Sequence, residues 1–271
     1  MALTMESLLQ TQVAFDGVAA EYDASNRANP ILRAMRTRAL ERLRREVPPG
    51  AHLLELGCGP GTDSRVLTDA GYDVTAIDVS PAMVAEARDR AQAGGGQARL
   101  KVRQLGIHEV DRLAPMVFDA AFSNFGPFNC VPDLPDAARQ LAARLRPGGV
   151  VVASVIGRVC PWEVALYLSR GQWRRATIRF SREAVPVPLA GGTVWTHYYS
   201  PREFSRVFEA AGFSCTTLQA LGLCGPPPYL GAFAARHPAL AEVLQGLDDA
   251  VGAWPGLRNW GDHFLVTLRK H

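Results

Sequence analysis

The fold of this chain is decided by one stretch, Leu53-Leu54-Glu55-Leu56-Gly57-Cys58-Gly59-Pro60-Gly61-Thr62-Asp63. It reads as the end of a buried strand, then three glycines at alternate positions, then the start of a helix. Glycine lets the backbone approach a ligand closely, and a helix N-terminus offers free N–H groups and a positive dipole end. A second strand, residues 74–77, ends in Asp78, where an acid can accept hydrogen bonds from ribose hydroxyls. The stretch therefore predicts a nucleoside-containing cofactor at the carboxyl ends of a parallel sheet.

The spacing of the glycines indicates which kind of cofactor binds. A dinucleotide-binding fold has the pattern G-x-G-x-x-G, and here Thr62 stands where its third glycine would be. Glu55 comes two residues before the first glycine, where a carboxylate would repel a pyrophosphate. A carboxylate there suits a cationic ligand, such as one with a free amino group. A nicotinamide-dependent oxidoreductase is therefore a disfavoured alternative.

The pattern E-x-G-x-G-x-G, together with Ala76-Ile77-Asp78-Val79-Ser80-Pro81-Ala82-Met83, resembles the first two motifs of the class I S-adenosylmethionine-dependent methyltransferases. The resemblance implies S-adenosyl-L-methionine as cofactor, with the glycine loop beside its methionyl part and Asp78 on its ribose. Residues 15–23 also resemble the F-D-x-x-A-x-x-Y-D entry of small-molecule, quinone-biosynthesis-like members. In those members the tyrosine lies beside the cofactor, which implies this role for Tyr22.

The clearest departure from the family follows the third strand. Gly106 stands where the family usually places an aspartate that accepts from the adenine amino group. We expect the backbone of Ile107 and the apolar side chains of Val79 and Met83 to hold adenine instead. After the fourth strand, Asn124 is expected between cofactor and substrate, with both donor and acceptor groups. The predicted cofactor-binding residues are Tyr22, Glu55, Gly57, Cys58, Gly59, Gly61, Asp78, Val79, Met83, Gly106, Ile107 and Asn124.

Two residues in the last third of the chain are candidate catalytic residues, His197 and Tyr199. An imidazole near its ordinary pKa can take a hydroxyl or amine proton at neutral pH. The alternative is a structural histidine in an edge strand, and it stays open. No histidine–carboxylate set has the spacing of a metal site, so no metal is expected.

Alternating strands and helices predict an α/β fold, a doubly wound, Rossmann-like seven-stranded sheet, mostly parallel, with an antiparallel terminal strand and an inserted lid. We expect a helix and turn over 62–73 and helices over 81–93, 134–145, 201–211 and 238–251, the one over 81–93 ending at Gly94-Gly95-Gly96. A first strand is expected to end with Leu53-Leu54, and further strands are expected over 74–77, 100–104, 118–122, 150–156, 214–218 and 262–269. The predicted organisation is an N-terminal helical cap (1–50), a cofactor-binding core (51–156), the lid (157–198) and the C-terminal part of the core (199–271).

The lid segment breaks the alternation of strands and helices. It interleaves Trp162, Trp173 and Trp195 with arginines that have few acidic neighbours in the sequence. We expect a mobile lid over the carboxyl edge of the sheet, with the tryptophans contacting an apolar substrate. The arginines would meet an acidic group on a substrate, a carrier or a membrane surface, or form a solvated face. They are Arg158, Arg170, Arg174, Arg175, Arg179 and Arg182. A second arginine run, residues 33–45, is interpreted as a solvated helix face.

Composition limits the remaining alternatives. The chain has 271 residues, 48% of them hydrophobic, enough for a full core, and a net charge of +3, too small to indicate nucleic acid. Its five cysteines lack close pairing, which favours free thiols and a cytoplasmic location. No segment resembles a secretory signal or a membrane span, although peripheral membrane contact stays open.

The sequence therefore predicts a methyltransferase that moves the methyl group of S-adenosylmethionine to an O, N or C atom of a small or lipid-like molecule. A non-catalytic scaffold of the same fold is the main alternative. The acceptor atom and the oligomeric state are not determined by the sequence.

Overall fold

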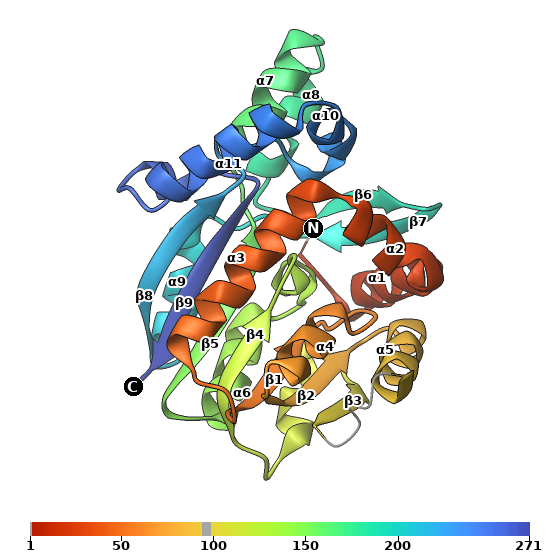
Figure 1. Cartoon of the computed structure of the whole chain (residues 1–271), viewed down its shortest axis with the longest axis vertical. Helices are drawn as coiled ribbons and strands as arrows, with labels where there is room; N and C mark the ends of the chain where they lie inside the picture. The colour runs from red at the N-terminus through yellow and green to blue at the C-terminus, as the bar shows by residue number, and fades with distance from the viewer. Residues whose placement is uncertain (1, 94–98) are drawn as a thin grey trace.

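The computed structural model describes residues 2–93 and 99–271, so the glycines expected to end the helix after residue 81 lie outside the described residues. Seven strands form one sheet in the order β3-β2-β1-β4-β5-β9-β8 (Figure 1). The first five pair in parallel, and β9 pairs antiparallel with both β5 and β8. This confirms the predicted fold class. The strands are β1 (His52–Leu56), β2 (Asp73–Asp78), β3 (Leu100–Gln104), β4 (Phe118–Ser123), β5 (Leu145–Ile156), β8 (Phe213–Leu221) and β9 (His263–Lys270).

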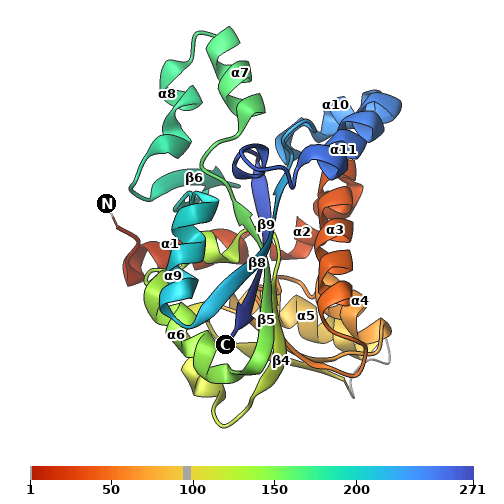
Figure 2. The ribbon, with the colours of Figure 1, turned by 90° about the vertical axis from the view of Figure 1, so that its left-hand side faces the viewer.

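Helices cover both faces of this sheet in three layers (Figure 2). One face carries α3 (Pro30–Glu46), α4 (Thr62–Asp69) and α5 (Pro81–Ala93). The other carries α6 (Leu134–Arg144) and α9 (Pro201–Ala210). The central strands are buried on both sides, as in β4, where Ala120, Ala121 and Phe122 are each 0% exposed. Burial on both faces explains why these strands are almost uniformly apolar rather than alternating.

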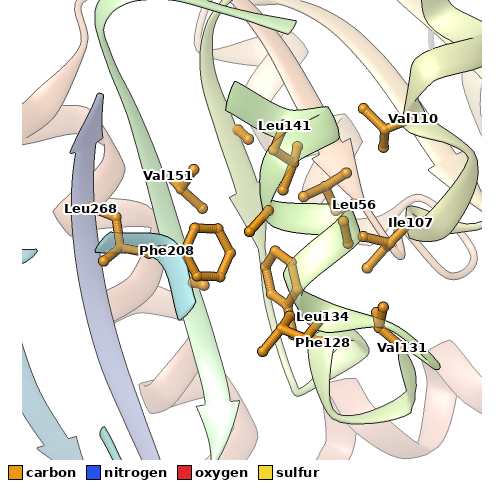
Figure 3. Close-up of a cluster of buried hydrophobic side chains, with 14 of the residues drawn as sticks. Leu56, Ile107, Val110, Phe128, Val131, Leu134, Leu141, Val151, Phe208 and Leu268 are labelled. Atoms are coloured by element: carbon orange, nitrogen blue, oxygen red, sulfur yellow. The ribbon is translucent and has the colours of Figure 1, made fainter. Parts of the chain in front are cut away.

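The larger core cluster lies between the sheet and α6 and α9. Leu56, Val151 and Leu268 from the sheet meet Leu141 and Phe208 from the two helices (Figure 3). Phe128 stacks edge-on against Phe204 and Phe208, with ring centroids 5.5 and 5.7 Å away. Phe128 belongs to η2 (Pro127–Cys130), the turn that follows β4. The core therefore holds the loop after β4 in place at the carboxyl edge of the sheet.

Two short helices precede α3, α1 (Met5–Asp16) and α2 (Ala19–Ala28), and one acid in each joins it to the sheet domain. Asp16 accepts hydrogen bonds from the Ser80 hydroxyl and from the backbone N–H of Ala82, at the start of α5. Asp23 accepts from the Thr62 hydroxyl and pairs with Arg90 at 2.8 Å. The N-terminal helices are therefore joined to the ends of α4 and α5, above the carboxyl edge.

The insertion after β5 consists of a helical part and a hairpin. The helical part contains α7 (Pro161–Ser169), α8 (Trp173–Ala176) and η3 (Ile178–Phe180), and the hairpin pairs β6 (Val185–Leu189) with β7 (Gly192–Thr196). Helices α7 and α8 stand clear of the sheet (Figure 2). Strand β7, by contrast, packs along α1. The insertion as a whole therefore does not cover the carboxyl edge as expected, because only its hairpin returns there.

Two of the six insertion arginines have acidic partners that the sequence did not reveal. Arg179 is buried, and its guanidinium donates to Glu163 at 2.6 Å and to Asp262 at 2.8 Å. Arg158 pairs with Glu203 at 2.9 Å. The expectation that these arginines lack neutralising partners was wrong for both, since Asp262 and Glu203 come from outside the insertion.

The rest of the chain packs at the far end of the sheet from β3. It contains η4 (Pro228–Leu230), α10 (Gly231–Arg236), α11 (Pro238–Val251) and η5 (Leu257–Asn259), while η1 (Ile107–Leu113) follows β3. Arg38 on α3 pairs with Asp249 on α11, and Asp248 accepts hydrogen bonds from four backbone N–H groups of residues 222–225. The five cysteines are free thiols. Among the described residues, no helix is long and apolar enough to span a membrane.

Candidate functional site

One cavity lies at the carboxyl ends of β1, β2, β3 and β4, under α1 and α2. Most of the residues predicted to bind a cofactor line it, although they come from five separate segments. These are Tyr22, Gly57, Cys58, Gly59, Asp78, Val79, Met83, Gly106, Ile107 and Asn124. Glu55, Gly61, His197 and Tyr199 are not among the lining residues. Binding by any of them stays a prediction, but the common cavity is what the two motifs required.

The three loop glycines have different surroundings. A Cβ on Gly57 would lie 2.5 Å from Pro127, so this glycine lets the loops after β1 and β4 pack together. A Cβ on Gly61 would lie 3.0 Å from Ala87 on α5, so this glycine serves the packing of two helices. A Cβ on Gly59 would meet nothing within 4 Å, and Gly59 lines the cavity with φ of 51°. Gly59 is therefore the loop glycine that has free space beside it for a ligand in the cavity.

Asp78 is the last residue of β2, and it lines the cavity. Its carboxylate accepts from the backbone N–H of Gly59 at 2.8 Å and from that of Ser80 at 2.9 Å. These bonds fix the carboxylate against the glycine loop, and burial raises its pKa. A carboxylate has about four acceptor sites, so two remain for ligand hydroxyls.

A charged cluster borders the cavity on the β1–β4 side. Arg36 of α3 pairs with Asp63 at 2.7 Å, and its guanidinium lies over the Phe125 ring at 5.0 Å. Asp63 also accepts from the Asn124 amide at 3.1 Å. Burial raises the pKa of Asp63, and Arg36 opposes that shift. All four side chains line the cavity, so a cation, an anion and an amide meet at this end.

Arg36 was interpreted from the sequence as part of a solvated face, and this was wrong. Its side chain is only 13% exposed because α3 runs beside the glycine loop. One sequence signal was present: Arg36 stands four and seven residues before Leu40 and Leu43, both buried on α3. A charge on the apolar face of an amphipathic helix needs a partner, which marks it as a candidate site residue.

Glu55 lies inside the sheet rather than at the cavity surface. It is 3% exposed, and the Ser64 hydroxyl donates to its carboxyl. Burial, reinforced by the nearby charge of Asp63, raises the pKa of Glu55 to about 8. Glu55 is therefore largely protonated at neutral pH, and direct contact with a cationic ligand is not the arrangement seen.

The β3 end of the cavity is apolar except for one histidine. Met83, Leu105 and Ile107 line it together with Gly106 and His108. Gly106 has an ordinary φ of −79°, and its backbone N–H donates to Glu109 at 2.9 Å. A Cβ on Gly106 would lie 2.4 Å and 2.5 Å from Cε1 and Nδ1 of His108. The imidazole therefore stands in the space where a side chain at position 106 would begin.

Another wall of the cavity comes from α1, from the segment after β4 and from β7, and it is mostly apolar. We call it the acceptor wall; its residues are Leu8, Thr11, Phe15, Cys130, Val131, Pro132, Val194 and Thr196. The only ionisable group among them is the Cys130 thiol, whose pKa is raised to about 12 by burial. Tyr22 borders this wall and packs edge-on against Phe15, with ring centroids 6.0 Å apart. Among the described residues, this wall therefore offers no effective base at neutral pH.

The two candidate catalytic residues lie outside the cavity. The backbone N–H of His197 donates to Asn129 O at 2.7 Å, and its ring stacks on Tyr199 at 4.4 Å. Tyr199 is 8% exposed and packs against Phe204 in the core. Burial lowers the pKa of His197 and raises that of Tyr199. The catalytic roles of His197 and Tyr199 therefore stay predictions, and the structure places both side chains away from the cavity lining.

The three insertion tryptophans also lie away from the cavity, contrary to expectation. Trp162 donates to Cys224 O at 2.8 Å, Trp195 donates to Gln10 at 2.6 Å, and Trp173 is 69% exposed near the turn between α7 and α8. Only Val194 and Thr196 bring the insertion to the cavity. The tryptophans are therefore not the substrate contacts that the sequence suggested.

One group of side chains within the described residues has the spacing of a metal site, Cys160, Glu163 and Asp262. The Arg179 guanidinium bonds both carboxylates, so a cation already occupies the position between them.

Comparison with known proteins relates this chain to methyltransferases. A family model described as a methyltransferase domain matches residues 26–218, more than two thirds of the chain. The malonyl-[acyl-carrier protein] O-methyltransferase of Salmonella typhimurium is 39% identical over 178 residues, which cover 64% of this chain and 64% of that protein. The ubiquinone biosynthesis O-methyltransferase of Xanthomonas campestris pv. campestris is 33% identical over 110 residues, 41% of this chain and 45% of that one. The chain thus spans less than two thirds of the length of either.

Solved structures share the fold over more of the chain. An S-adenosylmethionine-dependent methyltransferase from Listeria monocytogenes, described as putative, superposes with a TM-score of 0.60 at 16% identity, covering 87% of this chain and 98% of that one. The DhpI–SAH complex superposes with a TM-score of 0.59 at 22% identity and covers 98% of both chains. At these identities the similarity establishes the architecture.

Proposed function

We propose a reaction for this chain, which belongs to the methyltransferase domain family of class I S-adenosylmethionine-dependent enzymes. In this proposal it methylates a small or acyl substrate at a carboxylate oxygen. The observation that carries the proposal is a single cavity with two kinds of wall. One, which we call the cofactor wall, consists of Arg36, Gly59, Asp63, Asp78 and Asn124 with the apolar β3 end; the other is the acceptor wall, which lacks an effective base among the described residues. The cofactor wall supports methyl transfer, and the acceptor wall supports the choice of acceptor.

The residues of the cofactor wall fit S-adenosylmethionine part by part. Asp78 has acceptor sites left for ribose hydroxyls, and Gly59 leaves its open side to the ligand. Arg36, Asp63 and Asn124 offer a cation, an anion and an amide, which suit an amino acid group that carries both charges. The apolar side chains at the β3 end suit a flat base.

The acceptor wall limits which nucleophile can react. When bound, S-adenosylmethionine supplies a methyl group on a positively charged sulfur, and an attacking oxygen displaces that sulfur, which keeps the electron pair of the broken C–S bond. A phenol or alcohol must lose a proton in this reaction, whereas a carboxylate has already lost it. Since the Cys130 thiol is a poor base at neutral pH, the site favours an acceptor that arrives ionised.

An apolar wall also favours this reaction between opposite charges. Charge disappears as the methyl group moves from a cationic sulfur to an anionic oxygen, so removing water costs less at the transition state than it would for separated ions. Leu8, Val131 and Val194 supply such surroundings. The Salmonella relative is named for a malonyl group on a carrier protein, which is consistent with a carboxylate acceptor.

The test is methylation with cofactor labelled in its methyl group, using acceptors that differ in the reacting atom. The panel contains malonyl groups on a carrier protein, free dicarboxylic acids, a catechol-type phenol and a primary amine. We expect label in a product that releases labelled methanol in mild alkali, as a methyl ester does. Label transferred only into alkali-stable products would overturn the carboxylate proposal while leaving methyl transfer intact. Absence of cofactor binding would overturn both.

A further inference from the structure

We propose that His108 reads the edge of the adenine base in place of the acid missing at position 106, and that it therefore tolerates a 6-oxo base. The inference rests on the proposed function, since it requires S-adenosylmethionine in the cavity. It adds a specificity-determining residue that neither of the two sequence motifs contains.

The strand order places the base at the β3 end. In the sheet, β2 lies between β3 on one side and β1 and β4 on the other. A ribose held by Asp78, at the end of β2, must therefore extend one way toward Gly106–His108 and the other way toward Arg36 and Asn124. The charged cluster suits the amino acid group, so the apolar β3 end is left for the base.

His108 is the only ionisable side chain among the described residues lining that end. It lines the cavity with a side chain that is 20% exposed, and its nearest charged partner is Glu109, 4.0 Å from Nε2. Within the described part of the chain, neither ring nitrogen makes a hydrogen bond to protein. At least one ring nitrogen therefore has hydrogen-bonding capacity left for a ligand in the cavity.

The geometry also couples positions 106 and 108, because the His108 ring occupies the space beside Gly106. A Cβ at position 106 would lie 2.4–2.5 Å from the His108 ring, closer than real side chains approach. An acid at position 106 and the imidazole in its present place cannot coexist. A side chain at position 106 would therefore displace the His108 ring from its present place, and the glycine found there leaves the ring in position.

The two arrangements differ in the bases that they accept. A carboxylate only accepts hydrogen bonds, so it suits the 6-amino group of adenine and repels the 6-oxo group of hypoxanthine. A neutral imidazole has one donor and one acceptor nitrogen, so it can bond either group by changing tautomer or turning its ring. A histidine reader should therefore discriminate weakly between the two bases.

The experiment measures dissociation constants of S-adenosylhomocysteine and S-inosylhomocysteine by calorimetry on the full chain. The wild type should bind both, with affinities within about tenfold of each other. His108→Ala should weaken both by about fivefold, the value of one neutral hydrogen bond. His237→Ala, on an exposed histidine outside the cavity, is the matched control and should change neither.

A double variant makes the test independent of folding defects. Gly106→Asp alone should weaken S-adenosylhomocysteine binding, because the new side chain meets His108. Gly106→Asp with His108→Ala should restore this binding and should reject the inosyl analogue by about thirtyfold or more, since a carboxylate faces the oxo group.

Two results would overturn the inference. One is unchanged affinity for both ligands in His108→Ala; the other is rejection of the inosyl analogue by the wild type as strong as in the double variant. If the wild type binds neither ligand, the proposed function itself fails, so the two failures are distinguishable.

Discussion

At the scale of single residues, the Arg36–Asp63 ion pair predicts where the amino acid group of the cofactor binds. If Arg36 holds the cofactor carboxylate, Arg36→Gln should weaken S-adenosylhomocysteine binding by about 10- to 100-fold, because a charge-assisted hydrogen bond is lost. The control ligand is 5′-methylthioadenosine, which lacks the amino acid group. Its affinity should change less than twofold, and an equal loss for both ligands would place Arg36 elsewhere.

Asp78 makes the complementary prediction for the ribose. Asp78→Asn keeps an acceptor near Gly59 but loses the charge, and we expect affinity for 5′-methylthioadenosine and S-adenosylhomocysteine to fall together, by about tenfold or more. Calorimetry on both ligands checks this. A change confined to S-adenosylhomocysteine would contradict the ribose assignment, because both ligands carry the same ribose.

Glu55 makes a prediction about pH and stability. Its pKa is about 8 in the folded chain and 4.5 as an isolated group, so the folded state holds its proton over this interval and the unfolded state does not. The stabilisation from this proton is fully present below pH 4.5, declines as the pH rises and is gone above about 8. Urea unfolding of the ligand-free protein at several pH values checks this. The wild type should lose stability relative to Glu55→Gln with rising pH, approaching about 1.4 kcal/mol per pH unit; parallel curves would contradict it.

These residues also show how far a site can be predicted from sequence. The glycines and Asp78 were predictable because they belong to one βαβ unit, whose local geometry the motif specifies. Arg36 and His108 were not, because their place depends on how α3 and the loop after β3 pack against that unit. Glu55 was predicted as a ligand contact, but it is buried and does not line the cavity. No local sequence pattern indicates this difference.

At the scale of elements, the insertion is tied to the core by one buried cation. Arg179 joins Glu163 of α7 to Asp262, just before β9, and its guanidinium also lies over the Tyr198 ring at 5.1 Å. Arg179→Met should leave the buried Glu163 carboxylate unpaired and Asp262 with His263 as its side-chain partner. We expect this to cost about 3–5 kcal/mol in the free energy of unfolding. The matched control is Arg174→Met, on an exposed arginine of α8, which should stay within about 0.5 kcal/mol.

Arg179 and its neighbours also explain why the insertion was hard to predict. Its residues suggested a basic, tryptophan-rich lid, since Asp262 lies more than eighty positions away in the sequence and its pairing cannot be seen there. That pairing holds the pKa of Asp262 well below its usual range. By contrast, α5, β3 and α11 have the predicted bounds, because their periodicity and flanking breakers are local signals.

At the scale of the whole molecule, cofactor binding should stabilise the fold selectively. A ligand at a hundred times its dissociation constant adds about 2.7 kcal/mol, which for a chain of this size raises the melting temperature by about 5–10 °C. We expect this shift with S-adenosylhomocysteine and none with NAD, as measured by thermal denaturation. A shift with NAD alone would favour the oxidoreductase alternative.

The architecture was the most predictable level. Repeated strand–helix units allow few topologies, and the resemblance to class I methyltransferases implied the antiparallel terminal strand. The sequence could not reveal that β9 enters between β5 and β8, because strand neighbours are decided by packing of the whole sheet.

That central position of β9 has a consequence for biosynthesis. A ribosome makes β5 and β8 well before residues 263–270 emerge, yet β5 and β8 pair only with β9 on their facing sides. Until then a nascent chain presents the open edge of β5, whose side chains between Val150 and Val155 are almost completely apolar. An unpaired apolar strand is a template for aggregation. During translation the chain is therefore prone to aggregate until β9 emerges and pairs with β5 and β8.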